Sequence, residues 1–433
     1  MSNPSQRRSK RSDRDIDIST NNSEPKFGWR GNAVVWISVL LFIIAIYYFE
    51  FSPWVLFLLI PLALLTFLGW LTWMIVVRRG IFTWMRLAMK PTKLMAQGDA
   101  NGAENACAQA LERARRFGPD DHRRAIMLCE LAMFVKHQGR QTEALALYEE
   151  SVGILAKHLA TAPFDYFVGL NNYGICFIHL KDFESAQRIL EKAIDMILAA
   201  RKREADRYAV MPLQQVQTLE FVLHLNLAFL FMEMHELREA ELQLRDADAL
   251  EPLLTNKAQA GWEDHYIAIC AMWEFEASNY VEAEREIAQA RNPEYPACLR
   301  LRARLQLAKQ QFAEAEDLTR RYFAFEKKKG TLHRPDLLKA TLELAEALFG
   351  QGKRDDALAA FQEARSIVAD FALPHDAEWG KTLEVWATRA RQLDRLELAD
   401  ALEKELAAIS ARPSKAIMIL EKFRVHSPSE PEA

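Results

Sequence analysis

The sequence is poor in residues that break helices and lacks the motifs that carry most enzyme chemistry. Its 433 residues include only 16 Gly and 16 Pro, which excludes a collagen-like or low-complexity chain. Its five Cys stand far apart without a CxxC pair, so neither a disulfide scaffold nor a zinc ribbon is expected. No Walker A loop, GxGxxG, GxSxG, HExxH or kinase signature occurs, and the ten His form no metal-ligand grouping. We therefore predict no catalytic residue, no metal, no cofactor and no enzymatic activity.

One acidic pattern near the start of the chain imitates a calcium-binding loop. Asp13, Asp15 and Asp17 alternate along the chain, and Glu24 stands at the twelfth position of the pattern. Ile18 occupies the sixth position, where such a loop requires Gly, so we do not expect calcium to bind. The net charge of the whole chain is −4, which gives little general attraction to nucleic acid, and none is predicted as a partner.

Charge is distributed unevenly and divides the chain into three parts. Residues 1–32 hold seven Lys and Arg against four Asp and Glu, a net charge of +3, whereas residues 33–77 hold a single ionisable residue, Glu50. Residues 78–433 hold 48 basic and 54 acidic residues, a net charge of −6. The first part has no hydrophobic period and little apolar area to bury, so residues 1–28 are predicted to be a disordered basic tail.

The middle part is apolar enough to cross a membrane twice. A first apolar run extends from Ala33 to Phe49, and a second from Trp54 to Val77. A helix rises about 1.5 Å per residue and the hydrocarbon layer is ~30 Å thick, so about 20 residues suffice for a span. Pro53 can begin the second helix, because the first turn does not need its missing N–H. We predict a transmembrane helical hairpin over residues 30–78, with spans at about 31–50 and 54–77; the alternative is a pair of buried core helices.

The flanking charges predict the orientation of this hairpin. Basic residues precede the first span and follow the second, and only Glu50 lies between the spans. Because basic flanks stay on the cytoplasmic side, both termini are expected in the cytoplasm, and the chain is expected in the cell (inner) membrane. Those basic residues are Arg7, Arg8, Lys10, Arg11, Arg14, Lys26 and Arg30 before the hairpin, and Arg78, Arg79, Arg86, Lys90 and Lys93 after it.

Residues 79–118 are expected to connect the hairpin to the rest of the chain. Residues 80–97 mix apolar side chains with Arg86, Lys90 and Lys93, which fits either an interfacial helix on anionic lipid or an extension of the second span that ends near Pro91. Residues 99–117 are expected to form a degenerate first repeat.

A turn followed by an amphipathic helix recurs along the remaining chain. Each copy begins its helix near Glu or Asp, which suits the positive end of a helix, and each follows another amphipathic helix of about 12–14 residues. Internal repeats of this kind predict a solenoid. The copies are QGRQTEALALYEESV (138–152), LKDFESAQRILEKAI (180–194), MHELREAELQLRDAD (234–248), ASNYVEAEREIAQAR (277–291), KQQFAEAEDLTRRYF (309–323), QGKRDDALAAFQEAR (351–365) and the weaker LDRLELADALEKELA (393–407).

Small residues twelve positions apart support pairing of these helices. Antiparallel helices need a small residue where their axes approach most closely, since overpacking there costs roughly 1–3 kcal/mol. Seven such pairs recur in register, which a generic helical bundle with Ala-rich faces does not explain. The pairs are Ala132/Ala144, Gly174/Ala186, Ala228/Ala240, Ala271/Ala283, Ala303/Ala315, Ala345/Ala357 and Ala387/Ala399.

These units resemble tetratricopeptide repeats, whose small, aromatic and Ala positions they match. The match is clearest in the second and sixth units, at Leu170, Tyr173, Gly174, Phe177, Ala186, Leu190 and Ala193, and at Leu344, Ala345, Leu348, Ala357, Phe361 and Ala364. The resemblance implies an all-α fold, a right-handed superhelix (an α-solenoid) over residues 119–411, followed by a flexible tail at 412–433.

The spacing of the units indicates which kind of tetratricopeptide repeat they resemble. The first-helix small residues are 42, 54, 43, 32, 42 and 42 positions apart, and steps near 42 resemble the longer repeats of kinesin light chain and related bacterial proteins. The 54-residue step departs from this, and we expect residues 202–215 to be an insertion or a helical extension. The last unit, with Trp386 and Leu406, matches less well and is expected to act as a cap.

The resemblance also implies where a ligand would bind. In such superhelices the first helix of each unit lines the concave face, and this face combines apolar and polar groups that suit an extended or helical peptide. The set does not reproduce the Lys/Asn/Arg pattern that clamps chaperone tails. The residues expected to form this peptide-binding groove are Met133, Lys136, His137, Asn171, Asn172, Ile175, His179, Leu225, Phe229, Met232, His265, Met272, Phe275, Arg300 and Arg304.

The sequence thus predicts a membrane-anchored scaffold or adaptor that binds a protein or peptide at the cytoplasmic membrane surface. The lipid bilayer is its second predicted partner, through residues 30–78. An assembly or export factor with its repeats outside the cytoplasm is one alternative. A sensor or cryptic enzyme, with catalysis near 202–218, is another, although no paired nucleophile and base supports it.

Overall fold

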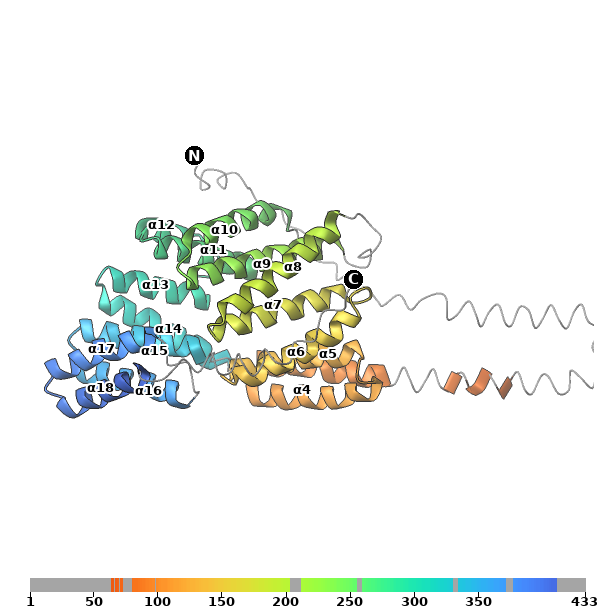
Figure 1. Cartoon of the computed structure of the whole chain (residues 1–433), viewed down its shortest axis with the longest axis horizontal. Coiled ribbons are helices and arrows are strands. Elements are labelled where there is room, and N and C mark those ends of the chain that lie inside the picture. Colours follow the sequence, from red (N-terminus) through yellow and green to blue (C-terminus); the bar gives the residue numbers. More distant parts are fainter. Residues whose placement is uncertain are drawn as a thin grey trace, which may run out of the picture. The chain divides into compact units, whose positions relative to one another are not determined.

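The computed structural model of the chain consists of helices joined by short turns in the part of the chain that it describes (Figure 1). The described residues are 64–65, 67–69, 71–72, 80–97, 99–202, 212–254, 259–329, 334–370 and 377–410, and within them no strand occurs. The chain divides into two units, residues 1–80 and 81–433. The helices are α3 (Lys90–Ala96), α4 (Ala100–Ala114), α5 (His122–His137), α6 (Gln141–Lys157), α7 (Pro163–His179), α8 (Phe183–Lys202), α9 (Leu213–Glu233), α10 (Leu237–Leu250), α11 (Gln259–Glu276), α12 (Tyr280–Ile287), α13 (Pro296–Ala308), α14 (Phe312–Lys329), α15 (Arg334–Gly350), α16 (Arg354–Asp370), α17 (Ala377–Gln392) and α18 (Leu396–Ser410).

The first unit is described at only a few positions, all of them helical. Leu64 and Leu65 lie in the second predicted span and are 58% and 66% exposed. Phe67 and Leu68 are also exposed, and the hydroxyl of Thr72 donates a 2.8 Å hydrogen bond to the carbonyl of Leu68, one helical turn earlier. The tail at 1–28 and the first predicted span at 31–50 lie outside the described residues, as does the tail at 412–433.

Among the described helices, α9 is the one long and apolar enough to cross a membrane. Two thirds of its most apolar stretch (67%) is buried inside the protein, as befits a core helix. In α9 the buried side chains follow one another almost without interruption, from Leu219 to Leu225. Its length and hydropathy therefore serve the packing of the repeats.

A helix over residues 80–88 leads into the second unit. Trp84, Leu87 and Ala88 pack against the core, while Phe82 and Met85 are exposed. The helix ends before Pro91, which stands in the first turn of α3, where proline is tolerated. Helices α3 and α4 then pack against one another. The expected degenerate repeat at 99–117 contains only α4 of this pair and the short turn after it, and it remains a prediction.

Seven further helical hairpins follow, from α5/α6 to α17/α18, and they coincide with the seven units predicted from the sequence. Thirteen of the fourteen small residues at the predicted crossing points are Ala, and each is 0–3% exposed. The fourteenth, Gly174, is buried as well. The two helices that flank the irregular step, α8 and α9, are 20 and 21 residues long. Residues 203–211 between these helices lie outside the described part, so the choice between an insertion and a helical extension at 202–215 remains a prediction.

The turn inside each of the seven hairpins has the same backbone geometry. The residue seven positions after the first-helix small residue has a positive φ, between 54° and 81°. The next residue donates its N–H to a carbonyl five positions back, for example Asp182 to Phe177 at 3.0 Å, which is the Schellman arrangement at a helix end. The positive-φ residues are Gly139, Lys181, His235, Ser278, Gln310, Gly352 and Asp394.

The hairpins stack so that first helices form an inner layer. From α5 to α15 each first helix packs against the first helix of the next unit, and the second helices cover this layer on the outside. One apolar cluster joins α4 to α11, and a second joins α15 to α18. Within residues 81–410 the layer winds far enough that Lys339 of α15 contacts Glu233 at the end of α9.

Candidate functional site

The inner layer of first helices brings together a row of amide side chains from neighbouring units. The Asn226 amide in α9 donates a 2.7 Å hydrogen bond to the amide oxygen of Asn171 in α7. Asn171 in turn lies 3.4 Å from the amide oxygen of Asn172, and the Asn172 nitrogen lies 3.8 Å from the sulfur of Cys129 in α5. Asn172 is half-buried, and among the described residues its side chain makes only these long contacts, so its amide can be offered to a ligand.

Lys136 of α5 lies beside this row with its side chain almost fully enclosed. The residue is only 8% exposed, and burial lowers the pKa of its ammonium below the ordinary value. The carboxylate of Asp336 in α15 partly opposes this effect. Within the described part of the chain, no hydrogen bond or ion pair joins the Lys136 ammonium to a protein group. An enclosed ammonium in this state favours an anionic ligand.

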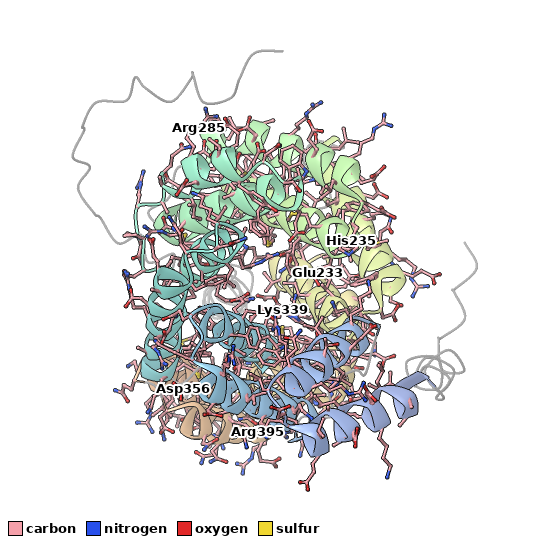
Figure 2. All side chains as sticks on the ribbon, turned by 90° about the vertical axis from the view of Figure 1, so that its left-hand side faces the viewer. Glu233, His235, Arg285, Lys339, Asp356 and Arg395 are labelled. Carbon is pink, nitrogen blue, oxygen red and sulfur yellow. The ribbon has the colours of Figure 1, made fainter. Side chains whose placement is uncertain are left out.

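Glu233, at the end of α9, forms ion pairs with two lysines from distant parts of the chain. One carboxylate oxygen lies 3.0 Å from the ammonium of Lys181 in the α7–α8 turn, and the other lies 3.1 Å from Lys339 in α15. Burial opposes the charge of Glu233, but the ammonium groups of Lys339 and Lys181 outweigh burial and hold its pKa below the ordinary value. In Figure 2 Glu233 and Lys339 lie next to one another near the centre of the view.

The two arginines expected in the groove are already engaged by carboxylates. Arg300 in α13 pairs with Asp336 at 2.9 Å and with Glu343 at 3.0 Å. Burial disfavours its charge, but these two carboxylates hold its pKa above the ordinary value. Arg304 pairs with Glu276 at 2.8 Å and covers the ring of Phe275 at 4.3 Å. Both arginines therefore tie neighbouring units together.

The other residues of the predicted groove are divided between core and inner surface. Leu225 and Met232 belong to the apolar core and offer almost no surface to a ligand. Met133 packs against the cluster between α4 and α5, and burial lowers the pKa of His265 to about 4. Whether any of these residues binds a ligand remains a prediction. The half-buried residues are Met133, His137, Asn172, Ile175, His179, Phe229, His265, Met272, Phe275, Arg300 and Arg304.

Sequence reasoning missed the three charged residues that meet across the inner layer. Glu233 and Lys339 are 106 positions apart, and their meeting depends on how far the solenoid winds over three units. No local pattern signals that contact. The turn position of Lys181 could have been found from its spacing, since Lys181 follows Gly174 by seven positions and therefore occupies the left-handed turn position of its unit.

Burial shifts the pKa of four cysteine thiols. Burial raises the pKa of the Cys107 and Cys298 thiols to about 12, and those of Cys129 and Cys176 to about 11, so all four are protonated at neutral pH. Where side chains are described, no group of three His, Cys, Asp or Glu residues is placed to hold a metal ion.

A family model supports the resemblance seen in the sequence. The model described as tetratricopeptide repeat matches residues 94–157, which span α4, α5 and α6. No curated protein matches the sequence.

Solved structures of repeat proteins are similar to the chain at low sequence identity. A Rap protein complexed with competence and sporulation factor is 15% identical, with a TM-score of 0.46, over 76% of this chain and 97% of the other. The APC/C hetero-tetramer Cut9-Hcn1 is 13% identical, with a TM-score of 0.48, over 78% of this chain and 55% of the other. A putative kinesin light chain from Podosopora anserina with nearly identical TPR-like repeats is 20% identical, with a TM-score of 0.26, over 58% of this chain and 96% of the other. Residues 94–157 thus match the tetratricopeptide repeat model, and the seven hairpins with buried small crossing residues form an all-helical repeat solenoid.

Proposed function

We propose that the chain is a scaffold that binds a protein or peptide segment on the concave face of its repeats and performs no catalysis. The inner layer of first helices carries this proposal. This layer combines the amide side chains of Asn171, Asn172 and Asn226 with the enclosed ammonium of Lys136. The amides suit a peptide backbone, and the ammonium suits an acidic group.

The second part of this proposal is an anchor in the cell membrane, with both termini in the cytoplasm. The apolar runs at 33–49 and 54–77 and their basic flanks support it. The exposed side chains of Leu64, Leu65, Phe67 and Leu68 also favour it, since large apolar groups on a helix surface suit lipid better than water. Anchoring would raise the effective concentration of the repeats near other membrane components.

Site-specific photo-crosslinking tests the binding face. A photoreactive amino acid replaces Asn172 on the inner layer of the full-length chain, and a matched control places it at Glu191 on α8, which is exposed on the outer layer. We expect the Asn172 position to capture a specific protein that the Glu191 position does not. Equal capture from both positions, or none from either, contradicts binding on the concave face.

Membrane fractionation and reporter fusions test the anchor separately. The full-length chain should stay in the membrane after carbonate extraction, and a reporter fused after residue 433 should be active only in its cytoplasmic form. Release by carbonate contradicts the anchor. Activity of an exported reporter contradicts the orientation and favours repeats outside the cytoplasm.

A further inference from the structure

The solenoid touches itself across its concave face, and this contact is ionic. Glu233 at the end of α9 pairs with Lys339 in α15 at 3.1 Å, across three repeat units. Among the described helices, α9 and α15 are not one of the pairs that pack closely against each other. The closure therefore lacks the apolar packing that joins neighbouring hairpins.

A further charged residue of α15, Asp336, lies beside this contact. Asp336 precedes Lys339 by three positions in α15, so the two side chains share one face of that helix. The charge of Asp336 acts on Lys136 in α5, and Lys339 meets Glu233 in α9. Asp336 itself is paired with Arg300 at 2.9 Å, so of these two α15 side chains Lys339 is the one that forms an ion pair with the earlier repeat that contains α9.

Several charged side chains gather around this contact. Lys136, Lys181, Lys339 and Arg300 face the carboxylates of Glu233, Asp336 and Glu343. Arg300 occupies Asp336 and Glu343, and Glu233 is shared by two lysines, which leaves Lys136 without a hydrogen bond or ion pair among the described residues. An acidic ligand would satisfy it.

We propose that Glu233 is an internal stand-in for an acidic partner: its ion pair with Lys339 closes the superhelix over the concave face, and carboxylates of the partner open it by taking the place of Glu233 on Lys181 and Lys339. This proposal rests on the binding function above and names the partner's chemistry, an acidic peptide segment. The second carboxylate of such a segment would reach Lys136.

The exposure of the paired groups makes this exchange possible. The side chains of Lys339 and Lys181 are 40% and 30% exposed, and that of Glu233 is 19% exposed. Ion pairs that water reaches are weak and are screened by salt, so a carboxylate supplied by a partner can compete with Glu233. By contrast, Arg300 is only 17% exposed and belongs to the permanent packing between α13 and α15.

The test measures binding of an acidic probe to the full-length chain in neutral detergent micelles. The probe is fluorescein-labelled hexaglutamate, with labelled hexaglutamine as the uncharged control, and the readout is fluorescence anisotropy. Glu233→Gln removes the internal competitor and should tighten hexaglutamate binding by at least about threefold. Lys339→Met should weaken it by a similar factor.

The control variant is Glu346→Gln, which removes one negative charge, as Glu233→Gln does. Glu346 pairs with Arg389 at 2.7 Å in the adjacent unit and does not take part in the closure. It should leave hexaglutamate affinity unchanged. Equal affinity in wild type and Glu233→Gln, or equal tightening in both Gln variants, overturns the proposal.

Hydrogen–deuterium exchange supplies a second readout that does not depend on the probe. Glu233→Gln should speed amide exchange at the start of α15 and at the end of α9, and raised salt should do the same in wild type. Unchanged exchange in both segments overturns the closure. If the closure opens as expected but photo-crosslinking finds no partner, the scaffold function fails while the ionic contact stands.

Discussion

The side chain of Leu190 in α8 fills the space where a Cβ atom of Gly174 in α7 would stand. A Cβ built on Gly174 would lie 2.7 Å from Cδ2 and 2.8 Å from Cγ of Leu190, closer than real Cβ contacts. Leu190 is fully buried, so it has little room to withdraw. The absence of a side chain at position 174 is thus what lets α7 and α8 approach one another.

We expect Gly174→Ala to destabilise the chain by roughly 1–3 kcal/mol, because Leu190 must shift within a packed core. The matched control is Gly153→Ala in α6, where no atom lies within 4 Å of the added Cβ. That change should stabilise by about 0.5–1 kcal/mol, since Ala is a better helix former than Gly. Far-UV circular dichroism during heating gives both midpoints, and shifts of the same sign would contradict this packing.

The crossing points of the hairpins were predictable because they are encoded locally. Each pair of small residues spans one turn and two half-helices, so spacing alone places the pair, and all fourteen are buried in the structure. The candidate binding residues were less predictable. Leu225 and Met232 occupy groove positions by family register, but α9 is apolar on nearly every side and both are buried in the core.

The contact between Glu233 and Lys339 was beyond the reach of local patterns. It depends on the rotation between successive units, which accumulates over three hairpins whose sequence steps differ. The shared turn geometry was also hidden, because only Gly139 and Gly352 among the seven left-handed positions are glycines. Residue type therefore did not reveal a conformation that the hairpin imposes.

His235 offers a test of that imposed turn. Its φ is 61°, a left-handed conformation that costs a residue with a Cβ roughly 1–2 kcal/mol. His235→Gly should remove much of this cost and raise stability by about 1 kcal/mol. The reverse change, Gly352→Ala, should lower stability by about 1 kcal/mol at a position where φ is 77°. Thermal midpoints that move in the opposite directions would contradict the turn geometry.

Trp386 joins the final hairpin to the rest of the solenoid. Its ring stacks on Phe361 of α16, with centroids 4.6 Å apart and planes within 7°, and meets the edge of Phe349 at 6.0 Å. Trp386→Ala should cost about 3–5 kcal/mol. Because a repeat contacts mainly its neighbours, we expect faster amide exchange in α17 and α18 and little change in α5 to α8. The exposed Val385→Ala is the control, and an equal effect on all repeats would argue against local coupling.

Glu130 in α5 predicts a pH dependence of stability. Burial raises the pKa of its carboxyl group from 4.5 to about 7, and one carboxylate oxygen is enclosed without a hydrogen-bond partner. Between these two values the folded chain binds more protons than the unfolded chain, so the free energy of unfolding falls as the pH rises through this window.

Glu130→Gln should remove this dependence, because an amide does not titrate. We expect the variant to gain about 2 kcal/mol over wild type near pH 8, after allowance for solvent screening, and almost nothing near pH 5. The measurement is the thermal midpoint of the full-length chain across this range. Glu112→Gln in α4 is the control, since Glu112 is exposed and pairs with Arg115 at 2.8 Å. A gain for Glu130→Gln that is equal at both pH values would mean that its carboxyl group keeps an ordinary pKa in the folded chain.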